Sequence, residues 1–322
     1  MHKSLLSLAL SCLFFTACKK NEEGVESNNS ESTEPITVSV GKGPDALFLT
    51  PDELKLYVAN VEGTSISVIN TNTDKVTKTI EGFQNPWGIT KISTSKIVVS
   101  NYGGQITVVD FQTDAVVSEK TFSTKFGGII SNTDGSTLFV IAIPEKKVYK
   151  LDATTLDSLD SYDTGNNPDG VELSSIDSLL MVTNTSDGTI SIINVNNKST
   201  SLLSPGGKPE LVHANKNGSK IYVSNFTLNK VHVLNGLTGQ LEQSLEGFDG
   251  PEEAIESSDG KYLYVVNFNS SSVDCFEVEN YKKLDESHKT GLKPIAVMPL
   301  SDNKKIYVSN YGENTVSVIE FE

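Results

Sequence analysis

The sequence repeats itself with a period of about 41 residues from Ile36 to residue 322. Two independent series of positions mark this repeat. The first is a proline near the start of each unit: Pro44, Pro86, Pro168, Pro209, Pro251 and Pro294. The second is an asparagine that ends a short apolar run: Asn60, Asn101, Asn184, Asn225, Asn267 and Asn310. One unit departs from both series, with Gly127 for the proline and Ala142 for the asparagine, so both series count seven units.

Each unit contains four short stretches with the composition of β-strands. The fifth unit is the clearest, with strands expected at Pro209–Ala214, Lys220–Asn225, Lys230–Leu234 and Leu241–Leu245. The pair Asn217-Gly218 between the first two strands is typical of a tight hairpin, because both residues tolerate positive φ. A period of this length that is built only of short strands is the signature of a β-propeller. We therefore predict an all-β fold, a seven-bladed β-propeller of four-stranded antiparallel blades.

The last unit contains only three expected strands before residue 322. The stretch Ile36–Val40, which precedes the first unit, has strand character of its own. We expect this N-terminal strand to complete the last blade and so to close the ring. Closure would remove the free sheet edges that otherwise favour aggregation.

The second and third strands of the units resemble a known family. Tyr-Val-x-Asn, as in residues 57–60, 222–225, 264–267 and 307–310, is followed by runs such as Val-Ser-Val-Ile at residues 316–319. This pattern is similar to the YVTN family of β-propeller repeats, and the resemblance covers residues 36–322. It implies the fold and leaves the function open.

The N-terminus has the pattern of an export signal. A short basic start is followed by an apolar run, Leu5–Phe15, that is shorter than the roughly 20 residues needed to span a bilayer. The run ends in Phe-Thr-Ala-Cys, which resembles a bacterial lipobox and implies that Cys18 is lipidated. We therefore predict a lipoprotein signal peptide at residues 1–17, an acidic flexible tether at residues 18–35 and the propeller at residues 36–322.

The acidic pair Glu22-Glu23 follows Cys18 closely and resembles the surface-export signal of some Gram-negative lipoproteins. It indicates an outer-membrane lipoprotein that faces the cell exterior, with a periplasm-facing anchor as the alternative. The whole chain has 26 Lys and Arg against 41 Asp and Glu, a formal net charge of −15. Nucleic acid is therefore not expected as a partner, because binding its phosphates needs a basic surface. Cys275 would be the sole cysteine of the propeller, and we expect it to pack in the core.

The proline and asparagine positions should lie at one mouth of the ring, where the blades differ in the residue that follows each marker. These residues predict a mouth with four carboxylates, the only tryptophan of the chain and several aromatic rings. The asparagines themselves are expected to hold turns. The predicted ligand-binding residues are Trp87, Tyr102, Asp169, Tyr311, Asp45, Glu210, Glu252, Phe226 and Phe268.

The sequence contains no arrangement typical of a metal, a cofactor or a catalytic group. The four carboxylates come from four units, and no Asp-rich calcium loop is present. His213 and His232 fall inside expected strands, and no pair of histidines has the spacing of metal ligands. No nucleophile elbow or nucleotide-binding loop is found. We therefore predict neither a metal, a cofactor nor a catalytic residue, and interpret the protein as more consistent with a binding protein than with an enzyme.

Two classes of function remain open. The chain resembles the surface cobalamin-binding propeller lipoproteins in its plan, which combines a lipid anchor, a linker and a seven-bladed propeller. That resemblance implies capture of a small molecule, of corrinoid or glycan type, for uptake, and it allows an outer-membrane transporter as a partner. The alternatives are a metal-dependent lactonase- or lyase-like propeller enzyme and a protein-interaction scaffold, because the fold alone does not decide the function.

Overall fold

The computed structural model describes residues 35–284 and 287–321, which belong to one compact unit, Thr33–Glu322. The predicted signal peptide, the predicted lipidation site Cys18 and the predicted tether up to residue 34 lie outside the described residues. The described chain forms 29 β-strands and one 3-10 helix, η1 (Ile143–Glu145). It contains no helix that is long and apolar enough to cross a membrane.

The strands group into seven antiparallel sheets, the blades. Blade 1 contains β2 (Pro44–Leu49), β3 (Lys55–Asn60), β4 (Ser65–Asn70) and β5 (Lys75–Glu81). Blade 2 contains β6 (Pro86–Lys91), β7 (Lys96–Asn101), β8 (Gln105–Asp110) and β9 (Ala115–Thr121). Blade 3 contains β10 (Phe126–Ser131), β11 (Thr137–Ala142), β12 (Lys147–Asp152) and β13 (Ser158–Asp163). Blade 4 contains β14 (Pro168–Leu173), β15 (Leu179–Asn184), β16 (Thr189–Asn194) and β17 (Thr200–Leu203).

Blade 5 contains β18 (Pro209–Ala214), β19 (Lys220–Asn225), β20 (Lys230–Asn235) and β21 (Leu241–Glu246). Blade 6 contains β22 (Pro251–Glu256), β23 (Tyr262–Asn267), β24 (Ser272–Glu277) and two short outer strands, β25 (Lys282–Lys283) and β26 (His288–Lys289). Blade 7 contains β27 (Pro294–Pro299), β28 (Lys305–Asn310), β29 (Thr315–Glu320) and the N-terminal strand β1 (Ile36–Ser39).

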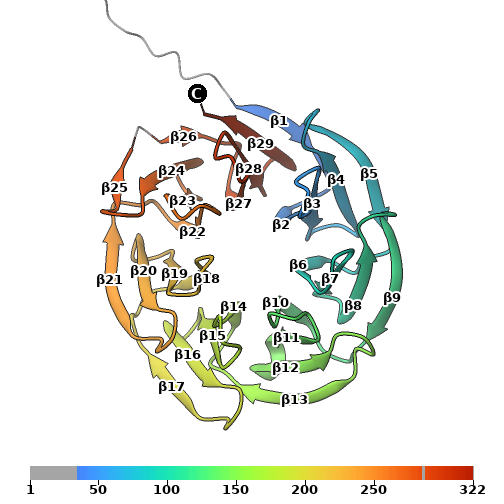
Figure 1. Cartoon of the computed structure of the whole chain (residues 1–322), viewed down its shortest axis with the longest axis vertical. Helices are drawn as coiled ribbons and strands as arrows, with labels where there is room; N and C mark the ends of the chain where they lie inside the picture. The colour runs from blue at the N-terminus through green and yellow to red at the C-terminus, as the bar shows by residue number, and fades with distance from the viewer. Residues whose placement is uncertain (1–34, 285–286, 322) are drawn as a thin grey trace, which may run out of the picture. The chain divides into compact units, whose positions relative to one another are not determined.

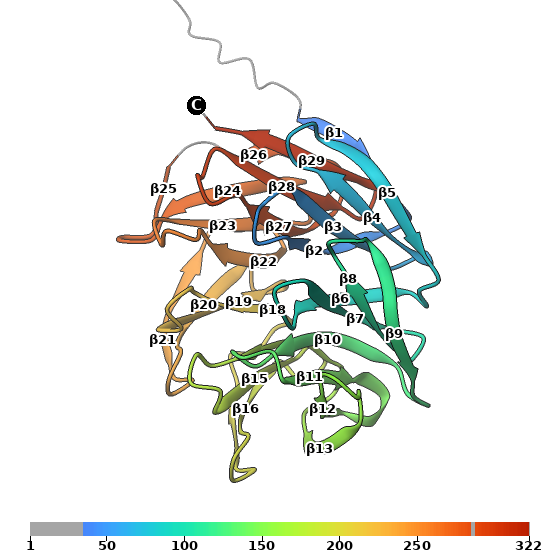
Figure 2. The same ribbon diagram turned by 45° about the vertical axis from the view of Figure 1, so that its right-hand side comes forward.

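The seven blades form a ring around a central channel, with the first strand of each blade innermost (Figure 1). The ring closes as the sequence predicts, because β1 pairs antiparallel with β29, from Ile36 opposite Val318 to Ser39 opposite Thr315. The view in Figure 2 shows β1 lying along β29 beside the first blade. The seven-bladed, four-stranded, all-β prediction is confirmed.

The first strand of every blade carries a β-bulge directly after its marker position. In blade 1, Pro44 pairs with Asn60 and Leu47 pairs with Val58. The first strand therefore advances by three residues where the second strand advances by two. The same shift recurs in the other six blades. A bulge bends the strand and re-aims side chains. In blades 1, 2 and 4 both positions after the marker line the channel, as Asp45 and Ala46 do, and in the other four blades the second position does.

The third blade corrects one sequence expectation. Phe126, not Gly127, pairs with Ala142 and so occupies the marker position, which places Gly127 and Gly128 one position later than expected. The Phe126 side chain is fully buried in the cluster between blades 2 and 3. The third blade therefore keeps its register by replacing a buried proline with a larger buried aromatic ring.

The hydrophobic core is divided into seven clusters, one at each interface between neighbouring blades. The cluster between blades 7 and 1 includes Val38 of β1, so the closing strand is also held by apolar packing. Cys275 is buried in the cluster between blades 6 and 7, which confirms the expected packing role. Because each cluster uses side chains of two blades, no blade buries its apolar face alone.

The marker asparagines stabilise turns, as expected. Asn184 is fully buried, and its Nδ2 donates to Thr189 Oγ1 at 3.0 Å and Ser191 Oγ at 2.9 Å, while its Oδ1 accepts from the Gly165 backbone N–H at 2.8 Å. Asn225 and Asn267 likewise accept from backbone N–H groups of the loop before their blade's first strand. In blades 4, 5 and 6 the asparagine side chain thus joins two loops of its blade, whereas the side-chain oxygens of Asn60 and Asn310 are buried without a hydrogen-bond partner within the described part of the chain.

Candidate functional site

The inner strands of all seven blades line a cavity of about 120 Å³ in the channel. The second position after each marker supplies one residue per blade, and most of these residues are small: Ala46, Gly88, Gly128, Gly170, Leu211, Glu253 and Ala296. A Cβ atom added to Gly128 would lie 2.6 Å from the Asp169 carbonyl oxygen, and one added to Gly170 would lie 2.7 Å from that of Glu210. Glycine is therefore required here, since neighbouring inner strands approach each other closely.

Trp87, Asp45 and Asp169 line this cavity, as the sequence predicts for a shared mouth. The indole of Trp87 stacks on the ring of Tyr102, with centroids 5.6 Å apart and planes at 27°. The Lys125 ammonium lies 4.6 Å from the centre of the Tyr102 ring. Blade 2 thus presents an aromatic pair at the mouth, with Trp87 on the bulged first strand and Tyr102 directly after the second.

A second aromatic pair lies across blades 5 and 6. Phe226 and Phe268 are in edge-to-face contact with ring centroids 5.7 Å apart. Ammonium groups lie over both rings, Lys208 over Phe226 at 5.2 Å and Lys293 over Phe268 at 5.8 Å. Such cation–π contacts stabilise both partners by about 0.5–1 kcal/mol at exposed sites. The two faces are therefore partly occupied by the protein itself.

Tyr311 does not join either aromatic pair. Its hydroxyl donates to a Glu62 carboxylate oxygen in the neighbouring blade, and this contact raises the Tyr311 pKa to about 12. An added Cβ at Gly43 would meet the Tyr311 ring at 3.1 Å. The ring is thus held against the loop of blade 1. Tyr311 does not line the cavity that Trp87 lines, so its predicted contact with a ligand stays a prediction.

The four predicted carboxylates act on one another electrostatically. Burial, followed by the charges of Asp169 and Glu253, raises the pKa of Asp45 to about 8. Burial, then repulsion from Glu210, raises the pKa of Glu252 to about 9. Both groups are therefore largely protonated near neutral pH, and each can donate a hydrogen bond as well as accept one.

The other two carboxylates, Glu210 and Asp169, interact with each other. Glu210 is 4% exposed and forms an ion pair with Lys208. Burial raises its pKa to about 7, with a further contribution from the charge of Asp169. Burial also raises the pKa of Asp169, although a hydrogen bond from Glu210 opposes that rise. The Lys208 ammonium acts on three of these acids, Asp169, Glu210 and Glu252, so the mouth combines one positive charge with carboxyl groups that can donate as well as accept hydrogen bonds.

Sequence reasoning missed a buried ion pair in the channel. His213 Nε2 lies 2.7 Å from Glu253 Oε1, and both residues line the cavity. Glu253 is 6% exposed and also accepts from the Val297 backbone N–H. Burial lowers the pKa of His213, but Glu253 and then Glu172 more than offset this, and the net effect is a rise. The signal in the sequence was Glu253 itself, a charge at a position where most other blades carry a small residue.

The described residues contain no group of three or more His, Cys, Asp or Glu side chains arranged to hold a metal ion. The acids of the mouth are therefore close enough to shift one another's pKa without converging on one point. Aromatic faces beside a few polar groups are features that small-molecule sites commonly share.

Comparisons with known proteins support the fold. No protein-family model matches the chain. Uncharacterized proteins from two strains of Staphylococcus epidermidis are 30% identical over 93 residues, which is 26% of this chain and 27% of theirs, so the match spans about a quarter of those relatives. Hydrazine synthase of Kuenenia stuttgartiensis is similar with a TM-score of 0.77 at 20% identity, covering 92% of this chain and 99% of that structure. The Cps50 (Swd1) β-propeller domain of Myceliophteria thermophila has a TM-score of 0.76 at 11% identity, covering 90% of this chain and 99% of that domain.

Proposed function

We propose that this β-propeller is a lipid-anchored binding protein of the cell surface that captures a small molecule at the mouth of its channel. The observation that carries the proposal is the stacked Trp87–Tyr102 pair beside the carboxylates Asp45 and Asp169. Flat aromatic faces next to a few polar groups are how proteins bind sugars and planar cofactors. The protonated carboxyls add donors that would recognise hydroxyl, carbonyl or amide oxygens.

The ligand class we propose is a polar molecule with a flat or ring-shaped face, of glycan or corrinoid type. The cavity between the inner strands is about 120 Å³, which is smaller than such a ligand. The ligand would therefore rest on the mouth, with one group entering the channel toward Asp169 and Glu210. The ligand would stack on the indole of Trp87. Among the described residues, lysine ammonium groups lie over the rings of Tyr102, Phe226 and Phe268, and none lies over Trp87.

Titration of the intrinsic fluorescence tests this proposal directly, because Trp87 is the only tryptophan of the 322 residues. Corrinoids, glycans and calcium are screened first by thermal shift. A ligand at 100 times its dissociation constant should stabilise the fold by about 2.7 kcal/mol. A stabilising ligand should also change the Trp87 emission and lose this effect in Trp87→Ala. A ligand that stabilises the protein without any change in the emission would argue against the mouth as the site.

The proposed localisation is tested separately. Cys18→Ala removes the lipidated residue and should release the protein from membrane fractions. Protease treatment of intact cells should degrade the wild-type protein if Glu22-Glu23 directs it outward. Retention of Cys18→Ala in the membrane fraction would contradict the anchor, and protection from protease would favour a periplasm-facing anchor. Neither result alters the expected binding at the mouth.

A further inference from the structure

Four blades carry a tyrosine at the same position of their second strand. All four side chains are nearly or completely buried, with exposures between 0% and 1%: Tyr57, Tyr222, Tyr264 and Tyr307. Each ring packs in the cluster between its own blade and the next. A buried tyrosine usually finds a hydrogen-bond partner for its hydroxyl, so the four sites can be compared directly.

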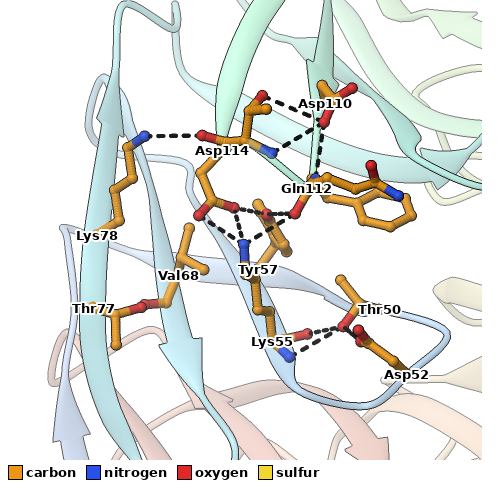
Figure 3. Close-up of polar contacts among 12 residues, drawn as sticks. Thr50, Asp52, Lys55, Tyr57, Val68, Thr77, Lys78, Asp110, Gln112 and Asp114 are labelled. Atoms are coloured by element: carbon orange, nitrogen blue, oxygen red, sulfur yellow. Dashed lines mark hydrogen bonds and ion pairs between the residues drawn. The ribbon is translucent and has the colours of Figure 1, made fainter.

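Three of these hydroxyls donate to a carboxylate of a neighbouring blade. Tyr57 donates to Asp114, Tyr307 donates to Asp74 at 2.5 Å, and Tyr222 donates to Glu256 at 2.7 Å. Figure 3 shows the Tyr57 site, where Asp114 lies in the turn between the third and fourth strands of blade 2. Asp74 lies in the corresponding turn of blade 1.

A lysine at the start of the second strand completes two of these sites. Lys55 Nζ lies 2.8 Å from Asp114, and Lys305 Nζ lies 2.9 Å from Asp74. The carboxylate thus binds a hydroxyl and an ammonium together in a mostly buried site, the arrangement in which charge-assisted hydrogen bonds are strongest. The turn aspartate is the element that supplies the carboxylate.

Tyr264 faces a different neighbour. The third and fourth strands of blade 7 are β29 and β1, which come from opposite ends of the described chain. No turn joins these two strands among the described residues, so Asp74 and Asp114 have no counterpart in the described part of this interface. Among the described residues, no hydrogen-bond partner of the Tyr264 hydroxyl is found.

A cavity of about 390 Å³ borders Tyr264 beside the hairpin loops between the first and second strands of blades 6 and 7, at the end of the blades opposite the mouth. Its walls combine apolar surface with polar groups: Tyr262, Tyr264, Leu284, Phe321, Asn303 and Lys304. Two acids also border it. The Asp259 carboxylate is already bound by Ser257, the Lys261 ammonium and the Asn303 amide, and the Asp302 carboxylate accepts from the Lys304 backbone N–H. The cavity volume lies within the range of small-molecule sites, about 300–1,000 Å³.

We propose that this cavity between blades 6 and 7 binds a carboxylate ligand with an apolar body, whose carboxylate accepts the hydrogen bond of Tyr264 as the turn aspartates do for Tyr57 and Tyr307. Lys304 supplies the positive charge at the cavity wall, and Tyr262, Leu284 and Phe321 supply the apolar surface. Burial raises the pKa of Tyr264, so its hydroxyl remains a donor at neutral pH. The carboxylate has two sources, a free organic acid or the acidic residue of a turn in a peptide.

The experiment uses the propeller in its full chain and two pairs of probes. The first pair is phenylacetate and the neutral phenylacetamide. The second is a peptide with the chain's own turn sequence, Asn70–Lys75, and the same peptide with Asp74→Asn. Isothermal titration should show binding of an acidic probe and binding about tenfold weaker or more for its neutral partner, the loss expected for a hydrogen bond to a charged group.

Tyr264→Phe should reduce the affinity for the acidic probe by about tenfold or more while the apo melting temperature changes little. Trp87→Ala should bind the probe as the wild type does, which separates this site from the mouth. Binding of phenylacetate assigns the site to free acids, and binding of the acidic peptide alone assigns it to protein turns. Equal binding of acid and amide, wild-type affinity in Tyr264→Phe, or binding of neither acidic probe would overturn the proposal.

Discussion

The walls of the blades and the mouth of the channel follow opposite rules. In the walls, the second and third strands of different blades are close to interchangeable, and their buried asparagines make similar hydrogen bonds in blades 4, 5 and 6. At the mouth, the first position after the marker varies around the ring and holds four acids, a tryptophan, a glycine and an isoleucine: Asp45, Trp87, Gly127, Asp169, Glu210, Glu252 and Ile295. Repetition stabilises a ring that needs seven similar interfaces, whereas a ligand needs particular groups at particular places.

The carboxylates illustrate this difference. In the perimeter turns, backbone N–H groups and neighbouring hydroxyls donate to Asp110 and Asp152, and these hydrogen bonds hold both pKa values below the usual range. At the mouth, burial and mutual repulsion raise the pKa values of Asp45 and Glu252 to about 8 and 9. The same chemical group stabilises the fold in one region and destabilises it in the other. Strongly perturbed pKa values cluster at functional sites, which makes the mouth the region to test for function.

The largest expected effect tests whether the walls carry the stability. Deleting residues 36–40 removes β1, its pairing with β29 and the buried Val38, and leaves a free sheet edge. We expect the melting temperature to fall by about 10 °C or more. Deleting residues 20–33 is the matched control and should change it by less than about 2 °C. Similar melting curves for the two deletions in circular dichroism would show that the closing strand is dispensable.

The next effect sharpens the comparison within the walls. Tyr307→Phe removes the hydroxyl that donates to Asp74 and should lower the free energy of unfolding by about 1–3 kcal/mol. Tyr264→Phe removes a hydroxyl with no partner among the described residues and should lower it by less than about 0.5 kcal/mol. Urea denaturation measures both, with Tyr57→Phe expected to match Tyr307→Phe. Equal losses at 264 and 307 would mean that Tyr264 already has a partner.

At the mouth we expect an effect on binding with little effect on stability. Trp87→Ala and Asp169→Ala should each weaken binding of the ligand found in the screen by about tenfold, or 1.4 kcal/mol. Their melting temperatures should stay within about 4 °C of the wild type, because both side chains lie at the channel and outside the inter-blade clusters. If both variants bind normally and Phe226→Ala or Phe268→Ala does not, the ligand lies on blades 5 and 6.

The fold could be predicted because a repeat averages out local ambiguity. The two marker series identify six of the seven blades directly and the seventh by its spacing. The first two strands predicted in blade 5 have the observed bounds, Pro209–Ala214 and Lys220–Asn225. The third blade, in which both markers are lost, is where the register was wrong by one residue. Phe126 is not a proline, and only the pairing with Ala142 reveals that it fills the same buried position.

The site could be predicted less completely because it depends on distances across the channel. The sequence placed Trp87, Asp45 and Asp169 at one mouth, and they do line one cavity. It did not reveal the His213–Glu253 pair, since the two residues stand at different positions of their repeats and meet only through the β-bulges. The raised pKa values also depend on burial, which periodicity does not report.

The pH dependence of stability gives the smallest expected effect. Asp45 and Glu252 have folded pKa values of about 8 and 9, above their usual 3.8 and 4.5. Between the usual and the raised values the folded state binds more protons than the unfolded state, so stability falls as the pH rises. The perimeter aspartates have lowered pKa values and lose stability only under acidic conditions. Calorimetry should therefore show a melting temperature that is lower at pH 8.5 than at pH 5.5, by about 2 °C or more.

Neutral variants assign that slope to the mouth. Asp45→Asn and Glu252→Gln remove the titration and should raise the melting temperature at pH 8.5 more than at pH 5.5, which flattens the profile. Asp259→Asn is the control from the perimeter, because hydrogen bonds to Asp259 hold its pKa far below the usual range and its carboxylate is charged at both pH values. It should lower stability equally at both. A wild-type slope in Asp45→Asn and Glu252→Gln would mean that the mouth carboxylates are better solvated than their burial implies and that other groups, such as His213, set the pH dependence.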